Sequence, residues 1–196
     1  ALNITLYYAS AFSTSYGKEY IAAYTIAINL WFLGAFIIDG YSSAGNILSG
    51  KLFGQENYQA LLRLSSKLIK YGIILGISMA IIGGLFYEII GTVFTKDPKV
   101  LHEFYQVFWI ILLMQPLCAL AFIFDGVFKG LGKMKYLRNV LLFSTFMVFL
   151  PLLFWLDSMN YKLYGIFIAF TAWIIARGVP LIIKFRQQFS LLSQKV

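Results

Sequence analysis

Residues 104–128 read FYQVFWIILLMQPLCALAFIFDGVF, a stretch of 25 residues in which Asp125 is the one charged side chain. An α-helix needs about 20 consecutive apolar residues to cross the hydrocarbon core of a bilayer, so this stretch is long enough to span a membrane. It shows no sustained alternation of apolar and polar residues, which a strand of a membrane barrel would require. The stretch is therefore predicted to be a transmembrane helix.

The composition of the whole chain agrees with this prediction. Of its 196 residues, 60% are hydrophobic and 12% are charged, and the mean hydropathy is +0.79. Ordinary soluble domains carry about 25% charged residues. The net charge of +8 comes from Lys and Arg residues in short clusters between apolar stretches, so no nucleic-acid partner is expected. An all-α membrane protein, in contact with the lipid bilayer, is predicted.

Six apolar segments are predicted to form a bundle of membrane helices. They cover residues 1–16, 20–50, 71–94, 104–128, 140–155 and 163–185. The first is short for a full crossing, which suggests a truncated helix, and the second is longer than one perpendicular crossing needs. Residues 57–70 have apolar residues at helical spacing with basic residues between them, so they form either a helix at the membrane surface or an N-terminal extension of the third segment.

The basic residues predict the orientation of the bundle. Eleven Lys and Arg residues follow the second, fourth and sixth segments, among them Lys51, Lys129 and Lys195, whereas four lie on the alternate side. Cytoplasmic loops are enriched in Lys and Arg. The C-terminus is therefore predicted to be cytoplasmic.

Two aspartates, each followed by glycine, lie in the apolar segments. Asp39 lies twelve residues before Lys51, so it is about 18 Å from the end of its helix. A carboxylate at that depth is a candidate site for protons, cations or substrate, with a structural ion pair as the alternative. Asp125 lies four residues before Lys129, about 6 Å by the same measure, and that spacing predicts an ion pair between them near the membrane surface.

Arg177 lies between these two depths, seven residues before Lys184. Because an unpaired guanidinium in a membrane helix is costly, we expect it to pair with Asp125 or Asp39 across the bundle. Pro116 is predicted to kink its helix, and Gln115 beside it is a candidate cavity residue.

Four aromatic residues lie at depths where they are candidates to line a cavity for flat cationic compounds through their ring faces. They are Phe36, Tyr41, Trp109 and Phe122. No spacing of ligands for a metal ion is present, and no nucleophile, base and orienting group converge, so neither a metal site nor an enzyme is expected.

Three motifs resemble those of a known family. They are DGYSSAGNILSGKLFGQ at 39–55, FDGVFKGLGKMKYLRN at 124–139 and ARGVPL at 176–181. Their order and spacing are similar to the C-terminal half of multidrug and toxic compound extrusion (MATE) transporters of the DinF-like branch. Asn46 occupies the position where that branch usually has Glu, so it is a further candidate for transport or coupling, although its side chain carries no charge for a cation.

The resemblance implies that residues 1–196 form one domain, helices seven to twelve of a twelve-helix transporter whose N-terminal half is absent from this sequence. Such proteins enclose a central cavity between two six-helix bundles and export amphipathic, often cationic compounds in exchange for protons or sodium. No other cofactor is implied, and a bacterial plasma membrane is the expected location. Two alternatives stay open: a lipid-linked oligosaccharide flippase of the same superfamily, and a half-length membrane module that does not transport.

Overall fold

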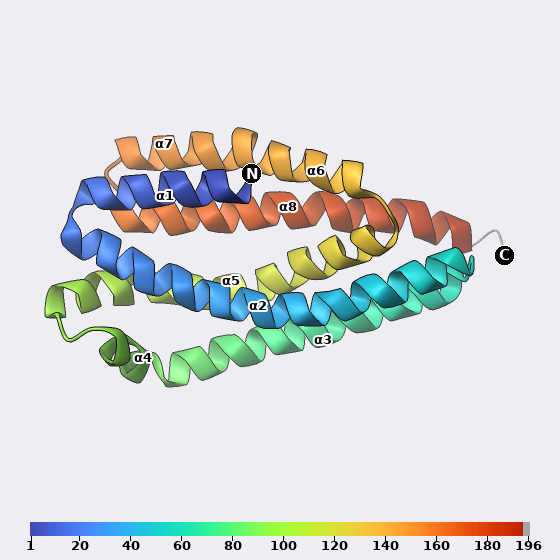
Figure 1. The fold of residues 1–196 in the computed structure, drawn as a ribbon, viewed down its shortest axis with the longest axis horizontal. Coiled ribbons are helices and arrows are strands. Elements are labelled where there is room, and N and C mark those ends of the chain that lie inside the picture. The colour runs from blue at the N-terminus through green and yellow to red at the C-terminus, as the bar shows by residue number, and fades with distance from the viewer. Residues whose placement is uncertain (194–196) are drawn as a thin grey trace.

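The computed structural model describes the backbone of residues 1–193 and the side chains of residues 1–187, which form one elongated helical bundle (Figure 1). The helices are α1 (Leu2–Tyr16), α2 (Lys18–Gly54), α3 (Tyr58–Leu85), α4 (Tyr87–Phe94), α5 (Pro98–Gly130), α6 (Met134–Phe143), a π-helix (Ser144–Phe149), α7 (Leu150–Ser158) and α8 (Lys162–Ser193). Lys195, one of the residues used to predict orientation, lies outside the described residues.

Five helical stretches of the described chain are long and apolar enough to cross a membrane. They are Lys18–Gly54, Tyr58–Leu85, Pro98–Gly130, Met134–Ser158 and Lys162–Gln187. The helix α1 lies against α2 and α8 but has 15 residues, fewer than a full crossing needs. The prediction of an all-α membrane bundle is confirmed.

The third predicted segment, 71–94, has different boundaries in the structure. The helix α3 begins at Tyr58, where the Asn57 side chain accepts a hydrogen bond of 3.0 Å from the backbone N–H of Ala60. Residues 57–70 are thus an N-terminal extension of the third helix rather than a separate surface helix. The helix α3 ends at Leu85, directly after Gly83 and Gly84, and a short helix α4 follows. Paired glycines weaken a helix. The hydropathy pattern did not reveal that the helix ends here.

The connections alternate between the two ends of the bundle (Figure 1). One end of the bundle holds the turn from α2 to α3 (residues 55–57), the turn from α5 to α6 (131–133) and the C-terminal end of α8. The other end holds the turn from α1 to α2, the turn from α4 to α5 (95–97) and the turn from α7 to α8 (159–161). The predicted basic clusters therefore gather at one end of the molecule. Which end faces the cytoplasm stays a prediction.

The central helix is α5, which packs against α2, α3 and α8. All six residues from Ile123 to Phe128 are buried. A Cβ atom on Gly126 would overlap with the Oγ and carbonyl oxygen of Ser42, and one on Gly130 would overlap with the carbonyl oxygen of Asn46. Small residues let two membrane helices approach closely, so these glycines set the crossing of α5 over α2. The Ser42 hydroxyl adds a 2.5 Å hydrogen bond to the carbonyl of Phe122.

Candidate functional site

A cavity of about 190 Å³ lies between α1, α2, α5 and α8 and collects most of the predicted site residues. Each long helix contributes one stripe at helical spacing. From α2 come Phe32, Phe36 and Asp39; from α5 come Phe122, Asp125 and Lys129; from α8 come Trp173 and Arg177. Three segments that are distant in sequence thus place two acidic and two basic side chains around one space with aromatic walls.

The floor of the cavity is an ion pair between the Arg177 guanidinium and the Asp125 carboxylate, in which Arg177 donates a hydrogen bond to Oδ2 of Asp125. The Asp125 residue is 5% exposed, and the Arg177 side chain is 17% exposed. A charge removed from water is tolerated where it has a charged and hydrogen-bonded partner. The expectation that Arg177 pairs with one of the two aspartates is met by Asp125.

Aromatic rings hold the Arg177 side chain in place. Its guanidinium carbon lies 5.3 Å from the centroid of the Phe122 ring and 5.5 Å from that of the Trp173 ring. A ring face attracts a cation over such distances, and the attraction grows where water is displaced. Phe122 and Trp173 therefore stabilise the charge of Arg177 and restrict its direction toward Asp125.

Of the two partners expected for Asp125, Lys129 and Arg177, the structure selects Arg177. Among the described residues, the salt bridge of Asp125 is with Arg177, and Lys129 is exposed at the rim of the cavity. Asp125 is also buried rather than exposed near the surface. The spacing to Lys129 gave a position along the helix axis, but it did not show that neighbouring helices enclose the face of α5 that carries Asp125.

Asp39 also lines this cavity, and its side chain is exposed. No ion pair or hydrogen bond of its carboxylate is recorded within the described part of the chain, although its charge interacts favourably with that of Arg177. Its own backbone carbonyl accepts a hydrogen bond from Ser43 at 2.9 Å. The deep aspartate is thus the one whose side chain remains available to a ligand or a proton.

The other predicted residues lie elsewhere. Gln115 is buried between α2 and α5, with its amide against Gly34, in a separate apolar pocket. The ring of Trp109 is half exposed and lies 5.8 Å from that of Tyr87, whereas Tyr41 packs among residues near Leu68. Asn46 contacts Gly130 through its backbone. None of these four lines the cavity that holds Arg177. The helix α5 continues through Pro116, and its kink stays a prediction.

Trp173 was not among the predicted residues, although it forms a wall of the cavity. Its indole N–H donates a hydrogen bond of 3.1 Å to Oγ1 of Thr145, and both side chains are fully buried. Thr145 belongs to the π-helix, where the widened turn precedes Pro151. Such turns are rare and are often found at functional sites. The spacing of Trp173 four residues before Arg177, on one face of α8, was the available signal.

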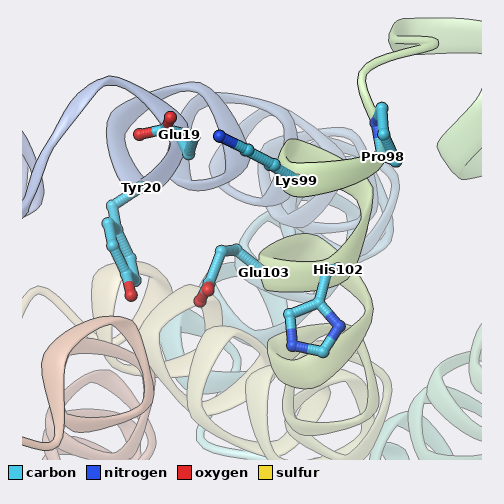
Figure 2. Close-up of a pocket in the computed structure, with 6 residues that line it drawn as sticks. All are labelled: Glu19, Tyr20, Pro98, Lys99, His102 and Glu103. Carbon is cyan, nitrogen blue, oxygen red and sulfur yellow. The ribbon is translucent and has the colours of Figure 1, made fainter.

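A second polar pocket, of about 390 Å³, lies at the end of the bundle where α2 and α5 begin (Figure 2). Glu19 and Tyr20 come from α2, and Lys99, His102 and Glu103 come from α5. In Figure 2 the Lys99 ammonium points toward the Glu19 carboxylate, whereas the His102 ring points away from both. His102 makes a 2.7 Å hydrogen bond with Gln106. The described residues contain no cluster of His, Cys, Asp and Glu that would hold a metal ion.

Helices that cross a membrane and enclose a charged cavity with aromatic walls define an integral membrane protein with a polar site inside the bundle. A comparison with family models assigns residues 3–155 to MatE. The chain therefore belongs to the MatE family of membrane transporters.

Individual relatives agree with this assignment. Protein DETOXIFICATION 42 of Arabidopsis thaliana is 32% identical over 138 residues, which cover 70% of this chain and 27% of the relative. Protein DETOXIFICATION 45, chloroplastic, of the same plant is 27% identical over 153 residues, 76% of this chain and 27% of the relative. The chain thus spans about a quarter of the length of these relatives.

A solved structure confirms the fold. The outward-facing conformation of a multidrug resistance MATE family transporter of the MOP superfamily superimposes with a TM-score of 0.88 at 17% identity. The match covers 98% of this chain and 44% of that protein. At this identity the likeness shows the arrangement of the helices.

Proposed function

We propose that this bundle is the C-terminal half of a secondary active exporter of the DinF-like branch, which moves amphipathic or cationic compounds in exchange for protons or sodium by alternating access. The order of the DG, DG and RG motifs supports the assignment to the C-terminal half. The bundle would work with an N-terminal bundle of the same transporter, and its basic end would face the cytoplasm.

The observation that carries the proposal is the cavity between α2, α5 and α8. Its aromatic walls suit the apolar part of an amphipathic compound, and the exposed carboxylate of Asp39 suits a cation or an exchangeable proton. The Arg177–Asp125 pair leaves Asp39 as the unpaired carboxylate among the described residues that line the cavity, with Lys129 exposed at its rim. A substrate and a coupling ion would then compete for one carboxylate, which is one way to couple their exchange.

The same observation weighs against the flippase alternative. A lipid-linked oligosaccharide carries phosphate groups, for which a cavity rich in Arg and Lys is expected. Here Lys129 joins Arg177, but two carboxylates balance the two cations. The cavity therefore offers no excess of positive charge to an anionic lipid.

The test is transport by the full-length protein in proteoliposomes, with ethidium as a fluorescent aromatic cation and an imposed proton or sodium gradient. We expect Asp39→Asn to slow the gradient-driven movement of ethidium, whereas Glu56→Gln, an exposed carboxylate between α2 and α3, leaves it unchanged. Equal transport by Asp39→Asn and the unchanged protein, across a range of pH, would remove Asp39 from the site. No transport of any tested compound would favour a module that does not transport.

A further inference from the structure

An apolar cavity at the side of the bundle shares no lining residue with the cavity that holds Arg177. It has a volume of about 280 Å³ and lies between α2, α3, α4 and α5. Its walls are apolar side chains, among them Leu33, Ile37, Met79 and Leu112, and its one polar side chain is Gln115. Leu33 and Ile37 are exposed large apolar residues, so the cavity opens sideways from the bundle.

Gln115 is 4% exposed, and its Oε1 atom has no hydrogen-bond partner. The amide lies against Gly34, where any Cβ atom would collide with it. A buried amide oxygen without a donor is costly, and the more so inside a membrane, where water does not compensate. Native structures contain few such groups, so this one needs a physical explanation.

The next residue along α5 removes a backbone donor. Pro116 has no N–H to give to the carbonyl of Leu112, four residues earlier in α5. Leu112 also lines the cavity. The Gln115 amide lies against Gly34, which also lines the cavity, and a half-turn of the amide exchanges the positions of its oxygen and its N–H₂ group. A hydroxyl group, which both donates and accepts, satisfies either arrangement.

The depth of Gln115 restricts what such a ligand is. Gln115 lies 15 residues before Gly130 and 17 residues after Pro98 in α5, about 22 Å and about 26 Å along the helix. It is therefore near the middle of the membrane. The polar head groups of phospholipids lie at the surfaces of a hydrocarbon core of about 30 Å, so they do not reach it. A small apolar molecule dissolved in the core does.

We propose that this cavity binds a small membrane-dissolved alcohol, whose apolar body fills the space beside Met79 and whose hydroxyl donates a hydrogen bond to the amide oxygen of Gln115. Cavities of roughly 150 Å³ already take up benzene, so a cavity of about 280 Å³ accepts an apolar body of that size or larger. The site is separate from the Asp39 cavity, and the proposal does not depend on transport activity.

The test is photolabelling of the full-length protein in phospholipid nanodiscs with an octanol that carries a diazirine, followed by peptide mapping. The methyl ether of the same probe, which has no hydrogen-bond donor, serves as the control compound. We expect the alcohol to label peptides that contain Met79 and Leu112, and to do so about two- to tenfold more than the ether, the ratio expected for one net hydrogen bond.

Three variants locate the contact. Gln115→Leu keeps the size of the side chain and removes the amide, so we expect the preference for the alcohol over the ether to disappear. Gln106→Leu, the same change on the same helix at a position already bonded to His102, should keep the preference. Met79→Trp fills the cavity and should abolish labelling by both probes.

Three outcomes would overturn the proposal. Equal labelling by alcohol and ether in the unchanged protein would mean that no ligand hydroxyl donates a hydrogen bond to the Gln115 oxygen, which is the contact proposed. A preference that survives Gln115→Leu would place the hydrogen bond elsewhere. Labelling spread evenly over all exposed apolar helix faces, and unaffected by Met79→Trp, would show partition into the bilayer without a site.

Discussion

The two Asp-Gly dipeptides, at 39–40 and 125–126, are the same in sequence and opposite in structure. Asp125 is buried in the central helix and bonded to Arg177, whereas Asp39 is exposed toward a cavity. A Cβ atom on Gly126 would overlap with Ser42, whereas one on Gly40 would meet nothing within 4 Å. The difference teaches that a charged residue in a membrane helix is structural or available to a ligand according to which face of the helix carries it.

The largest expected effect is loss of the ion pair at Asp125. Arg177→Ala leaves a buried carboxylate without a partner and should lower the free energy of unfolding by about 3–5 kcal/mol. The measurement is denaturant-induced unfolding in detergent micelles. Adding Asp125→Asn should restore part of the loss, because the unpaired charge is then gone. If the effects of the two changes simply add, the pair does not stabilise the bundle.

The two glycines provide the next comparison. Gly126→Ala forces a Cβ atom against the backbone of Ser42 and should lower the unfolding free energy by about 1–3 kcal/mol. Gly40→Ala has free space and gains helix propensity of up to about 1 kcal/mol. Thermal unfolding of the two variants side by side measures the contrast. Equal effects in the same direction would contradict the close crossing of α5 over α2.

A smaller effect is expected at the wall beside Arg177. Thr145→Val leaves the buried indole N–H of Trp173 without an acceptor and should lower the unfolding free energy by about 1–2 kcal/mol. Thr171→Val is the matched control, because Thr171 bonds within its own helix, to the carbonyl of Phe167. Near-ultraviolet circular dichroism should change for Thr145→Val and stay constant for Thr171→Val. Unchanged spectra in both would show that Thr145 does not hold Trp173.

The smallest expected effect on stability is at Asp39. Because this carboxylate is exposed to the cavity, Asp39→Asn should change the unfolding free energy by no more than about 0.5 kcal/mol. Asp125→Asn should change it by several times that amount. Comparing both variants in the same unfolding assay tests the contrast between the two dipeptides directly. A large loss of stability in Asp39→Asn would mean that Asp39, too, is a structural residue.

The sequence by itself determined the class of the fold, since uninterrupted apolar stretches near 104–128 and 163–185 leave little choice but helices in a membrane. It also indicated that Arg177 needs a carboxylate partner, because an isolated charge there is too costly. The depth of each charge followed from the regular rise of a helix. Hydropathy also predicted the helical extension at 57–70 as one of two possibilities.

The tertiary structure decided which faces of these helices are enclosed. The helix α5 lies between α2, α3 and α8, so Asp125 is buried although it lies near the end of its helix. Lys129, one turn further along α5, is exposed and leaves Asp125 to Arg177. The position of a residue along a helix is set by its own chain, whereas the side on which a neighbour packs depends on residues far away in sequence. The small residues Ser42 and Gly126 fix that packing by allowing two helices to touch.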